Sequence, residues 1–271
     1  MVDILGSALS SGLPSVLASS DSGAATLQTL TPASGIYLLI PLIIGLPLLG
    51  ATVLLLAGRR SNAWGHWLAI LMVALSFALG VAMFVQMLGT DEAQRGVQDT
   101  LMNWFTVGDF TAQFGFQLDQ LSIIFVLLIT GVGGLIHIYS VGYMAEDPDR
   151  RKFFAYLNLF VAAMLLLVLS DNFALLYFGW EGVGLASYLL VGFWQYKPTA
   201  AAAAKKAFVM NRVGDFGLAI GVFLIFATFG TVAYPQVFAA APEASTTVIN
   251  IIGVLLLVGA AAKSAQFPLH A

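Results

Sequence analysis

Seven long runs of predominantly apolar residues divide this sequence, and they constrain the fold more than any other feature. A helix needs about 20 apolar residues to cross the hydrocarbon core of a bilayer. The runs cover residues 36–57, 65–88, 117–141, 153–170, 172–194, 206–229 and 247–263. Lipid cannot hydrogen-bond an unpaired backbone, and the runs are continuous rather than alternating, so they predict helices and not a barrel. We expect an all-α polytopic membrane protein with about seven transmembrane helices.

The composition supports a membrane protein and excludes several kinds of site. Only 9% of the 271 residues are charged, whereas soluble domains have about 25%. The net charge of −3 gives no reason to expect a nucleic-acid partner. The chain has no cysteine, which rules out disulfides, thiolate-bound iron–sulfur clusters and cysteine zinc sites within it. Its three histidines are far apart in sequence and indicate no metal site.

The chain divides into three regions by composition. Residues 1–35 are rich in Ser, Gly, Ala and Thr and have no basic segment before an apolar core, so they are not a standard signal peptide. We interpret them as an extracytoplasmic leader, either weakly structured or a surface helix. Residues 36–141 hold the first three expected spans, and residues 142–271 hold the other four.

The positive charges predict the orientation of the spans. Basic residues gather after spans one, three and five, at Arg59, Arg60, Arg150, Arg151, Lys152, Lys197, Lys205 and Lys206. The opposite loops hold only Arg95. Since cytoplasmic loops are enriched in Lys and Arg, this bias predicts that the N-terminus lies outside, on the side of the membrane opposite the cytoplasm.

The stretch GWEGVGLASYLL, residues 179–190, places a glutamate inside the fifth span. Glu181 lies nine residues beyond Asn172, or about 13 Å along a helix, which is near the middle of the bilayer. An intramembrane carboxylate is costly unless it is paired, hydrated or protonated, and such residues mark ion and proton paths. A structural hydrogen bond between helices is the alternative. We favour a role in transport or proton relay.

Lys263 lies about 21 Å into the seventh span, counted from Ile249. Pro268 follows it and predicts a break in that helix, since proline removes a backbone donor. Broken helices at membrane depth line ion sites in transporters, so Lys263 is a candidate proton carrier. The alternative is a lysine that extends to the cytoplasmic interface. His270 follows the break and could exchange protons with Lys263.

Arg212 and Asp215 lie inside the sixth span at i, i+3 spacing, so they share one helix face and can form an ion pair. A structural pair is the simplest interpretation, and a role in tuning a proton path is the alternative. His137 lies late in the third span, where we expect an interfacial polar residue rather than a relay.

Four segments together resemble one family. LIHIYSVGYM (135–144), FGWEGVGLASYLLVGFW (178–194), KAFVMNRVGDFGLA (206–219) and AAAKSAQFPLH (260–270) resemble, in order, the largest antiporter-like subunit of respiratory complex I. This is subunit L of the bacterial enzyme and subunit 5 of the mitochondrial one. The resemblance runs from about residue 36 to the chain end.

The resemblance implies a fold of two inverted helical repeats, each with a broken helix and a buried lysine. It implies proton translocation driven by NADH–quinone chemistry in other subunits, where NAD, FMN, iron–sulfur clusters and quinone would bind. Glu181 and Lys263 match the family's carboxylate–lysine pair, and Arg212 and Asp215 match charged positions in its sixth span. The implied partners are the other membrane-arm subunits, above all the neighbouring antiporter-like one.

The family continues beyond the PLH motif with the rest of the broken helix, a second repeat and a lateral helix. By this comparison residues 142–271 are an incomplete first repeat, and the chain alone is not expected to pump. It could be a fragment, a truncated product or one half of a split subunit. Two other functions remain open: a secondary cation/proton antiporter subunit, and a membrane scaffold that transports nothing.

Overall fold

The computed structural model describes residues 16–21, 24–108 and 110–270. The main helices are α1 (Ile40–Leu56), α2 (Gly65–Leu88), α3 (Gln120–Tyr143), α4 (Arg150–Leu169), α5 (Phe173–Val191), α6 (Pro198–Phe229), α7 (Tyr234–Ala240) and α8 (Thr246–Lys263). In the described part, seven helices are long and apolar enough to cross a membrane, and α7 is not among them. The all-α membrane fold expected from the sequence is confirmed.

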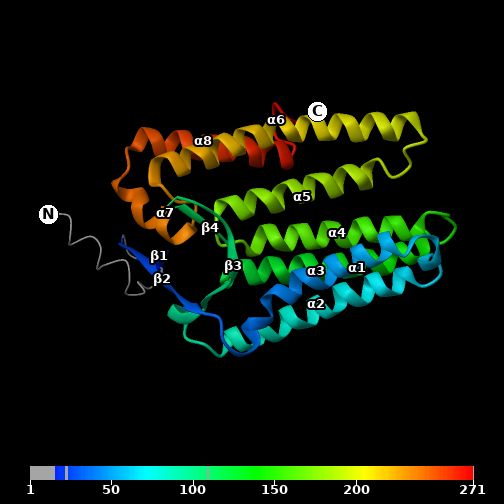
Figure 1. Cartoon of the computed structure of the whole chain (residues 1–271), viewed down its shortest axis with the longest axis horizontal. Helices are drawn as coiled ribbons and strands as arrows, with labels where there is room; N and C mark the ends of the chain where they lie inside the picture. Colours follow the sequence, from blue (N-terminus) through cyan, green and yellow to red (C-terminus); the bar gives the residue numbers. More distant parts are fainter. Residues whose placement is uncertain (1–15, 22–23, 109, 271) are drawn as a thin grey trace.

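The spans lie side by side and roughly parallel, with α5 between α4 and α6 (Figure 1). α6 begins at Pro198 instead of residue 206, because proline suits the first turn of a helix and the alanines that follow have the highest helix propensity. α8 ends at Lys263, and residues 264–270 form turns around Pro268. The break therefore comes directly after the lysine.

Glycines set the close approach between the helices that hold the intramembrane charges. A Cβ built at Gly214 of α6 would lie 2.2 Å from the Cβ of Ala262 in α8. At Gly179 of α5 it would lie 2.7 Å from the backbone nitrogen of Leu167 in α4. Real Cβ atoms essentially never come so close, so α8 and α4 can pack here only against glycine. Small residues at helix interfaces serve this purpose in membranes.

A small four-stranded sheet lies with α7 at one end of the bundle (Figure 1). Its strands are β1 (Val16–Asp21), β2 (Ala24–Pro32), β3 (Gly96–Val107) and β4 (Phe110–Leu118), in that order. The β1–β2 and β3–β4 pairs are antiparallel and β2–β3 is parallel. The sequence interpretation assigned no strands. Within the expected leader, residues 16–21 and 24–32 form strands rather than a surface helix, and residues 1–15 lie outside the described part.

The turn between α4 and α5 ties the sheet to the bundle through Asp171. Its carboxylate, on a residue only 2% exposed, accepts hydrogen bonds from Gln98 Nε2 at 3.1 Å and Asn172 Nδ2 at 2.6 Å. Its backbone N–H donates to Gly115 O, and its carbonyl accepts from Tyr234 N. Burial raises the pKa of this carboxyl above the ordinary 3.8, and the two side-chain donors lower it by less.

The Asp171→Asn variant should show how this burial affects stability. A raised pKa means that the folded chain binds the proton more tightly than the unfolded chain. The wild type should therefore lose stability as the pH rises through the interval from 3.8 to the raised value, whereas the asparagine variant should not. Melting temperatures of the two proteins in detergent, from about pH 4 to about pH 7, would diverge with rising pH. Asp91→Asn, which changes an exposed carboxyl, is the control. Parallel melting curves for wild type and Asp171→Asn would contradict this account.

Candidate functional site

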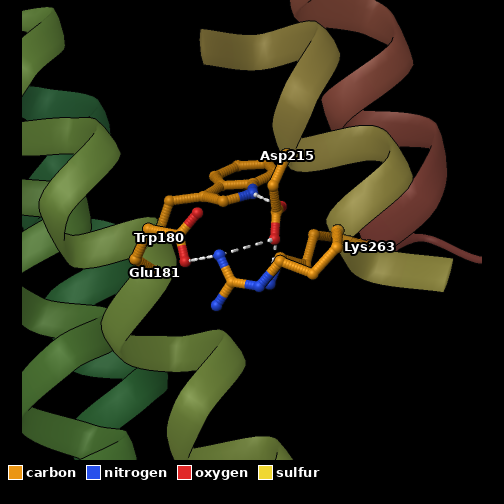
Figure 2. Close-up of polar contacts among 5 residues, drawn as sticks. Trp180, Glu181, Asp215 and Lys263 are labelled. Carbon is orange, nitrogen blue, oxygen red and sulfur yellow. Dashed lines mark hydrogen bonds and ion pairs between the residues drawn. The ribbon is translucent and has the colours of Figure 1, made fainter. Parts of the chain in front are cut away.

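Four charged side chains from three membrane-spanning helices lie together (Figure 2). Glu181 comes from α5, Arg212 and Asp215 come from α6, and Lys263 ends α8. The approach of α6 to α8 at their glycine contacts brings Lys263 onto the face of α6 that holds the ion pair. The sequence had singled out all four residues, and the structure brings them together.

The charges alternate in sign along one line of contacts. Arg212 Nη1 donates to Glu181 Oε2. The same nitrogen lies 3.8 Å from Asp215 Oδ2, and Lys263 Nζ lies 3.8 Å from Asp215 Oδ1. The order is thus Glu181, Arg212, Asp215, Lys263. The predicted i, i+3 pair of Arg212 with Asp215 is present, with Nη1 and Oδ2 3.8 Å apart.

The resemblance had implied a direct pair between Glu181 and Lys263, and the described ion pairs do not include it. Glu181 is bound by Arg212, and Lys263 is bound by Asp215. Arg212 comes between the two because its long side chain reaches from α6 to the glutamate on α5. The expected control of the lysine by the glutamate would therefore have to pass through two other side chains.

Trp180 is a member of the site that the sequence interpretation missed. Its indole Nε1 donates to Asp215 Oδ1 at 2.6 Å, and Lys263 Nζ lies 5.8 Å from the centre of a Trp180 ring (Figure 2). The indole therefore orients the carboxylate that pairs with the lysine and also offers the ammonium a π face. The available signal was its position next to Glu181, since an indole N–H buried in a membrane needs an acceptor.

Burial differs along the line of charges. Asp215 is the most enclosed, with 3% of its side chain exposed, against 19% for Lys263, 22% for Glu181 and 38% for Arg212. Three buried polar atoms of the site have no hydrogen bond in the described part of the chain: Glu181 Oε1, Asp215 Oδ2 and Lys263 Nζ. Each of these atoms can therefore accept or donate one further hydrogen bond, as a proton-transfer group must.

Gly184 leaves the space that the lysine ammonium occupies. A Cβ built at this position would lie 2.8 Å from Lys263 Nζ. Any side chain there would push the ammonium away from α5. The third glycine of GWEGVG thus has a local reason within the site.

The sequence made predictions for two histidines, His270 and His137, and the structure describes the surroundings of both. The ring of His270 stacks on Phe267, with centroids 5.7 Å apart, and the described contacts do not connect it to the four charges. His137 is not interfacial: it is 1% exposed, and its Nδ1 lies 2.7 Å from the Gly133 carbonyl oxygen. Among the described residues, no group of three or more His, Cys, Asp or Glu could hold a metal ion.

Two family models match the chain. Residues 104–154 match the N-terminus of chain 5 of NADH-ubiquinone oxidoreductase (complex I). Residues 170–271, which include all four charges, match the transmembrane model of NADH:quinone oxidoreductase and the Mrp antiporter. The fold and these models define an antiporter-like membrane protein.

Curated relatives narrow the class. The chain is 61% identical over 230 residues to NADH-quinone oxidoreductase subunit L of Mycobacterium tuberculosis, which covers 85% of this chain and 36% of the relative. It is 42% identical over 229 residues to NADH-ubiquinone oxidoreductase chain 5 of Cryptococcus neoformans, covering 84% and 34%. The chain belongs to the family of complex I subunit L and chain 5. It spans about a third of the length of these relatives.

Solved structures agree on the fold. The chain superposes on the Mrp complex from Dietzia sp. DQ12-45-1b with a TM-score of 0.73 and 22% identity, covering 86% of this chain and 24% of the other. It superposes on the membrane-bound sulfane sulfur reductase, an archaeal respiratory membrane complex, with a TM-score of 0.71 and 20% identity, covering 85% and 46%. At this identity the likeness establishes the shared fold.

Proposed function

We propose that this chain is a proton-translocating subunit in the membrane arm of an NADH:quinone oxidoreductase. The line of alternating charges inside the membrane spans is the observation that supports this most, because such residues are costly in lipid and mark ion and proton paths. Its relatives are named as subunits of NADH-quinone and NADH-ubiquinone oxidoreductases, so the driving reaction in this proposal is electron transfer from NADH to quinone. In this proposal NAD, FMN, iron–sulfur clusters and quinone bind to partner subunits, and this chain performs no redox step.

Lys263 holds the transferred proton in the proposed mechanism. An ion pair stabilises the charged form of both partners. Asp215 therefore stabilises the charged ammonium of Lys263 as long as Arg212 does not take its place at the carboxylate. Arg212 can serve either carboxylate, since its Nη1 contacts Glu181 and lies 3.8 Å from Asp215. When Glu181 is neutralised, Arg212 moves to Asp215, and the lysine releases its proton. Glu181 thereby controls Lys263 through two intermediate side chains.

We place the sheet end of the bundle outside a bacterial inner membrane, with the N-terminus on that side. The support is the distribution of basic residues: Arg59 and Arg60 follow α1, and Arg150, Arg151 and Lys152 begin α4. These two helix ends lie at the end of the bundle opposite the sheet (Figure 1). The proposed partners are the other membrane-arm subunits and the surrounding lipid. The neighbouring antiporter-like subunit is the first of these to expect, because the relatives belong to multi-subunit complexes.

A secondary cation/proton antiporter subunit is the second candidate. The observation in its favour is that the model matching residues 170–271 covers the Mrp antiporter as well, and that the fold superposes on an Mrp complex. Such a subunit would use the same charges without a redox partner.

The driving force separates these functions. Inverted membrane vesicles from cells with and without this chain would be energised by NADH, or separately by a sodium gradient, and lumenal acidification would be followed with a pH-sensitive dye. We expect NADH to drive acidification that depends on the chain, and the sodium gradient alone to drive none. Chain-dependent acidification by sodium alone would favour the antiporter. Acidification that is unchanged by charge-neutral substitutions at both Glu181 and Lys263 would leave a scaffold as the better interpretation.

A further inference from the structure

A cavity of about 340 Å³ lies between the ends of α4, α5 and α6, and none of the four charged residues lines it. These ends lie at the same end of the bundle, opposite the sheet (Figure 1). The residues of the cavity that concern its chemistry are Asp147, Asp149, Lys152, Tyr156, Tyr188 and Lys205. Neither the family models nor the proton path accounts for a polar cavity here.

The two acidic side chains of the cavity are already engaged by groups of this chain. Asp147 Oδ2 accepts from Trp194 Nε1 at 2.9 Å, and its Oδ1 accepts from the backbone N–H of Asp149 at 2.8 Å. Asp149 Oδ1 lies 3.0 Å from Lys152 Nζ and neutralises it. The carboxylates of Asp147 and Asp149 are thus already bound by other groups that surround the cavity.

The remaining donors of the wall have no acceptor. Within the described part of the chain, the ammonium of Lys205 and the hydroxyls of Tyr156 and Tyr188 take part in no hydrogen bond or ion pair. The rings of the two tyrosines contact other aromatic rings, Tyr156 with Phe193 and Tyr188 with Phe208. A cavity that presents a free cation and two free hydroxyls favours an anion with several oxygens, and a phosphate group has that chemistry.

The position of the cavity favours a phosphate that belongs to a lipid. It begins where the apolar face of α5 ends, near Leu189 and Gly192, and Trp194 also lines it. Trp and Tyr gather at the level of the lipid headgroups, and Lys side chains near the cytoplasmic surface attract anionic headgroups. Lys197, whose Nζ lies 4.5 Å from the centre of a Trp194 ring, is a further positive charge beside this wall residue.

We propose that this cavity binds the phosphodiester headgroup of an anionic phospholipid, with Lys205 as the charged contact and Tyr156 and Tyr188 as hydroxyl donors. The acyl chains of that lipid would follow the apolar surface of the spans. This site shares no residue with the line of charges, and the proposal would hold equally for a complex I subunit or an antiporter subunit.

Adjacent lysines provide a matched test. Lys205 lines the cavity and Lys206 does not, so Lys205→Gln and Lys206→Gln remove the same charge from neighbouring positions. The detergent-solubilised complex that contains this chain would be titrated with short-chain phosphatidylglycerol or with phosphatidylcholine, and bound lipid would be counted by native mass spectrometry. We expect Lys205→Gln to weaken binding of one phosphatidylglycerol about fivefold, which is the effect of one basic residue at an anionic surface. Lys206→Gln should bind phosphatidylglycerol as tightly as the wild type does. Phosphatidylcholine should bind equally to the wild type and to both variants.

Three outcomes would overturn the proposal. The first is equal binding of phosphatidylglycerol by Lys205→Gln and the wild type. The second is equal weakening in both lysine variants, which would reflect the surface charge alone. The third is displacement of the lipid by an excess of inorganic phosphate, which would indicate a site for the free ion. If Lys205→Gln does not assemble, Tyr188→Phe keeps the ring contact with Phe208 and removes only the hydroxyl; unchanged lipid binding in that variant would equally contradict the proposal.

Discussion

Lys263→Met is expected to slow proton transfer through this chain by about a hundredfold, the lower end of what a positioned acid–base group contributes. Methionine occupies the space of the lysine stem in an apolar environment but cannot bind a proton. Asp215 keeps its hydrogen bond from Trp180 and its contact with Arg212, so the site retains partners for the carboxylate. The measurement is NADH-driven acidification of inverted vesicles, divided by the rate of NADH oxidation in the same vesicles.

Lys263→Arg separates the charge from the titration. Arginine can keep the ion pair with Asp215, but it does not release its proton at any pH that a protein tolerates. We therefore expect this variant to assemble in normal amounts, judged by immunoblot of the purified complex, and to pump as poorly as Lys263→Met. Pumping at the wild-type level in Lys263→Arg would mean that the lysine acts only as a fixed cation.

The spans could be predicted from the sequence because each apolar run is long enough to satisfy a bilayer by itself. The beginning of α6 and the small sheet could not be predicted from hydropathy. α6 starts within the polar-flanked alanine segment at Pro198, where hydropathy gives no signal but helix propensity does. β2 pairs in parallel with β3 over residues 30–32 and 96–98, and such a distant pairing depends on the whole fold rather than on the local pattern.

The site shows the same division between local and long-range information. Spacing alone gave the Arg212–Asp215 pair, because residues three apart share a helix face. Which carboxylate pairs with Lys263 depends on how deeply α8 packs against α6, and the glycine contacts at Gly214 and Gly217 set that register. A prediction made one helix at a time cannot supply it, so the sequence paired Glu181 with Lys263, whereas the described ion pairs join Lys263 to Asp215.

Glu181→Gln is expected to lower NADH-driven pumping strongly while the complex still assembles. Glutamine keeps the size of the side chain and removes the charge that Arg212 binds. Arg212 is then free to move the short distance to Asp215, where it competes with Lys263 for the carboxylate. Pumping by the assembled variant is measured in inverted vesicles, and unchanged pumping would refute a role for the glutamate.

The order of the contacts also predicts how the effect of Glu181→Gln combines with that of Arg212→Gln. If Glu181 acts on the lysine through Arg212, the double variant Glu181→Gln/Arg212→Gln should pump about as well as the poorer of the two single variants, because both changes interrupt the same connection. If the two residues act independently, their losses should multiply. Glu243→Gln, a change on the short helical turn before α8 and outside the site, combined with Arg212→Gln supplies the additive reference. Losses that multiply in the Glu181/Arg212 pair would show that the line of charges seen in the fold is not the route by which the glutamate controls the lysine.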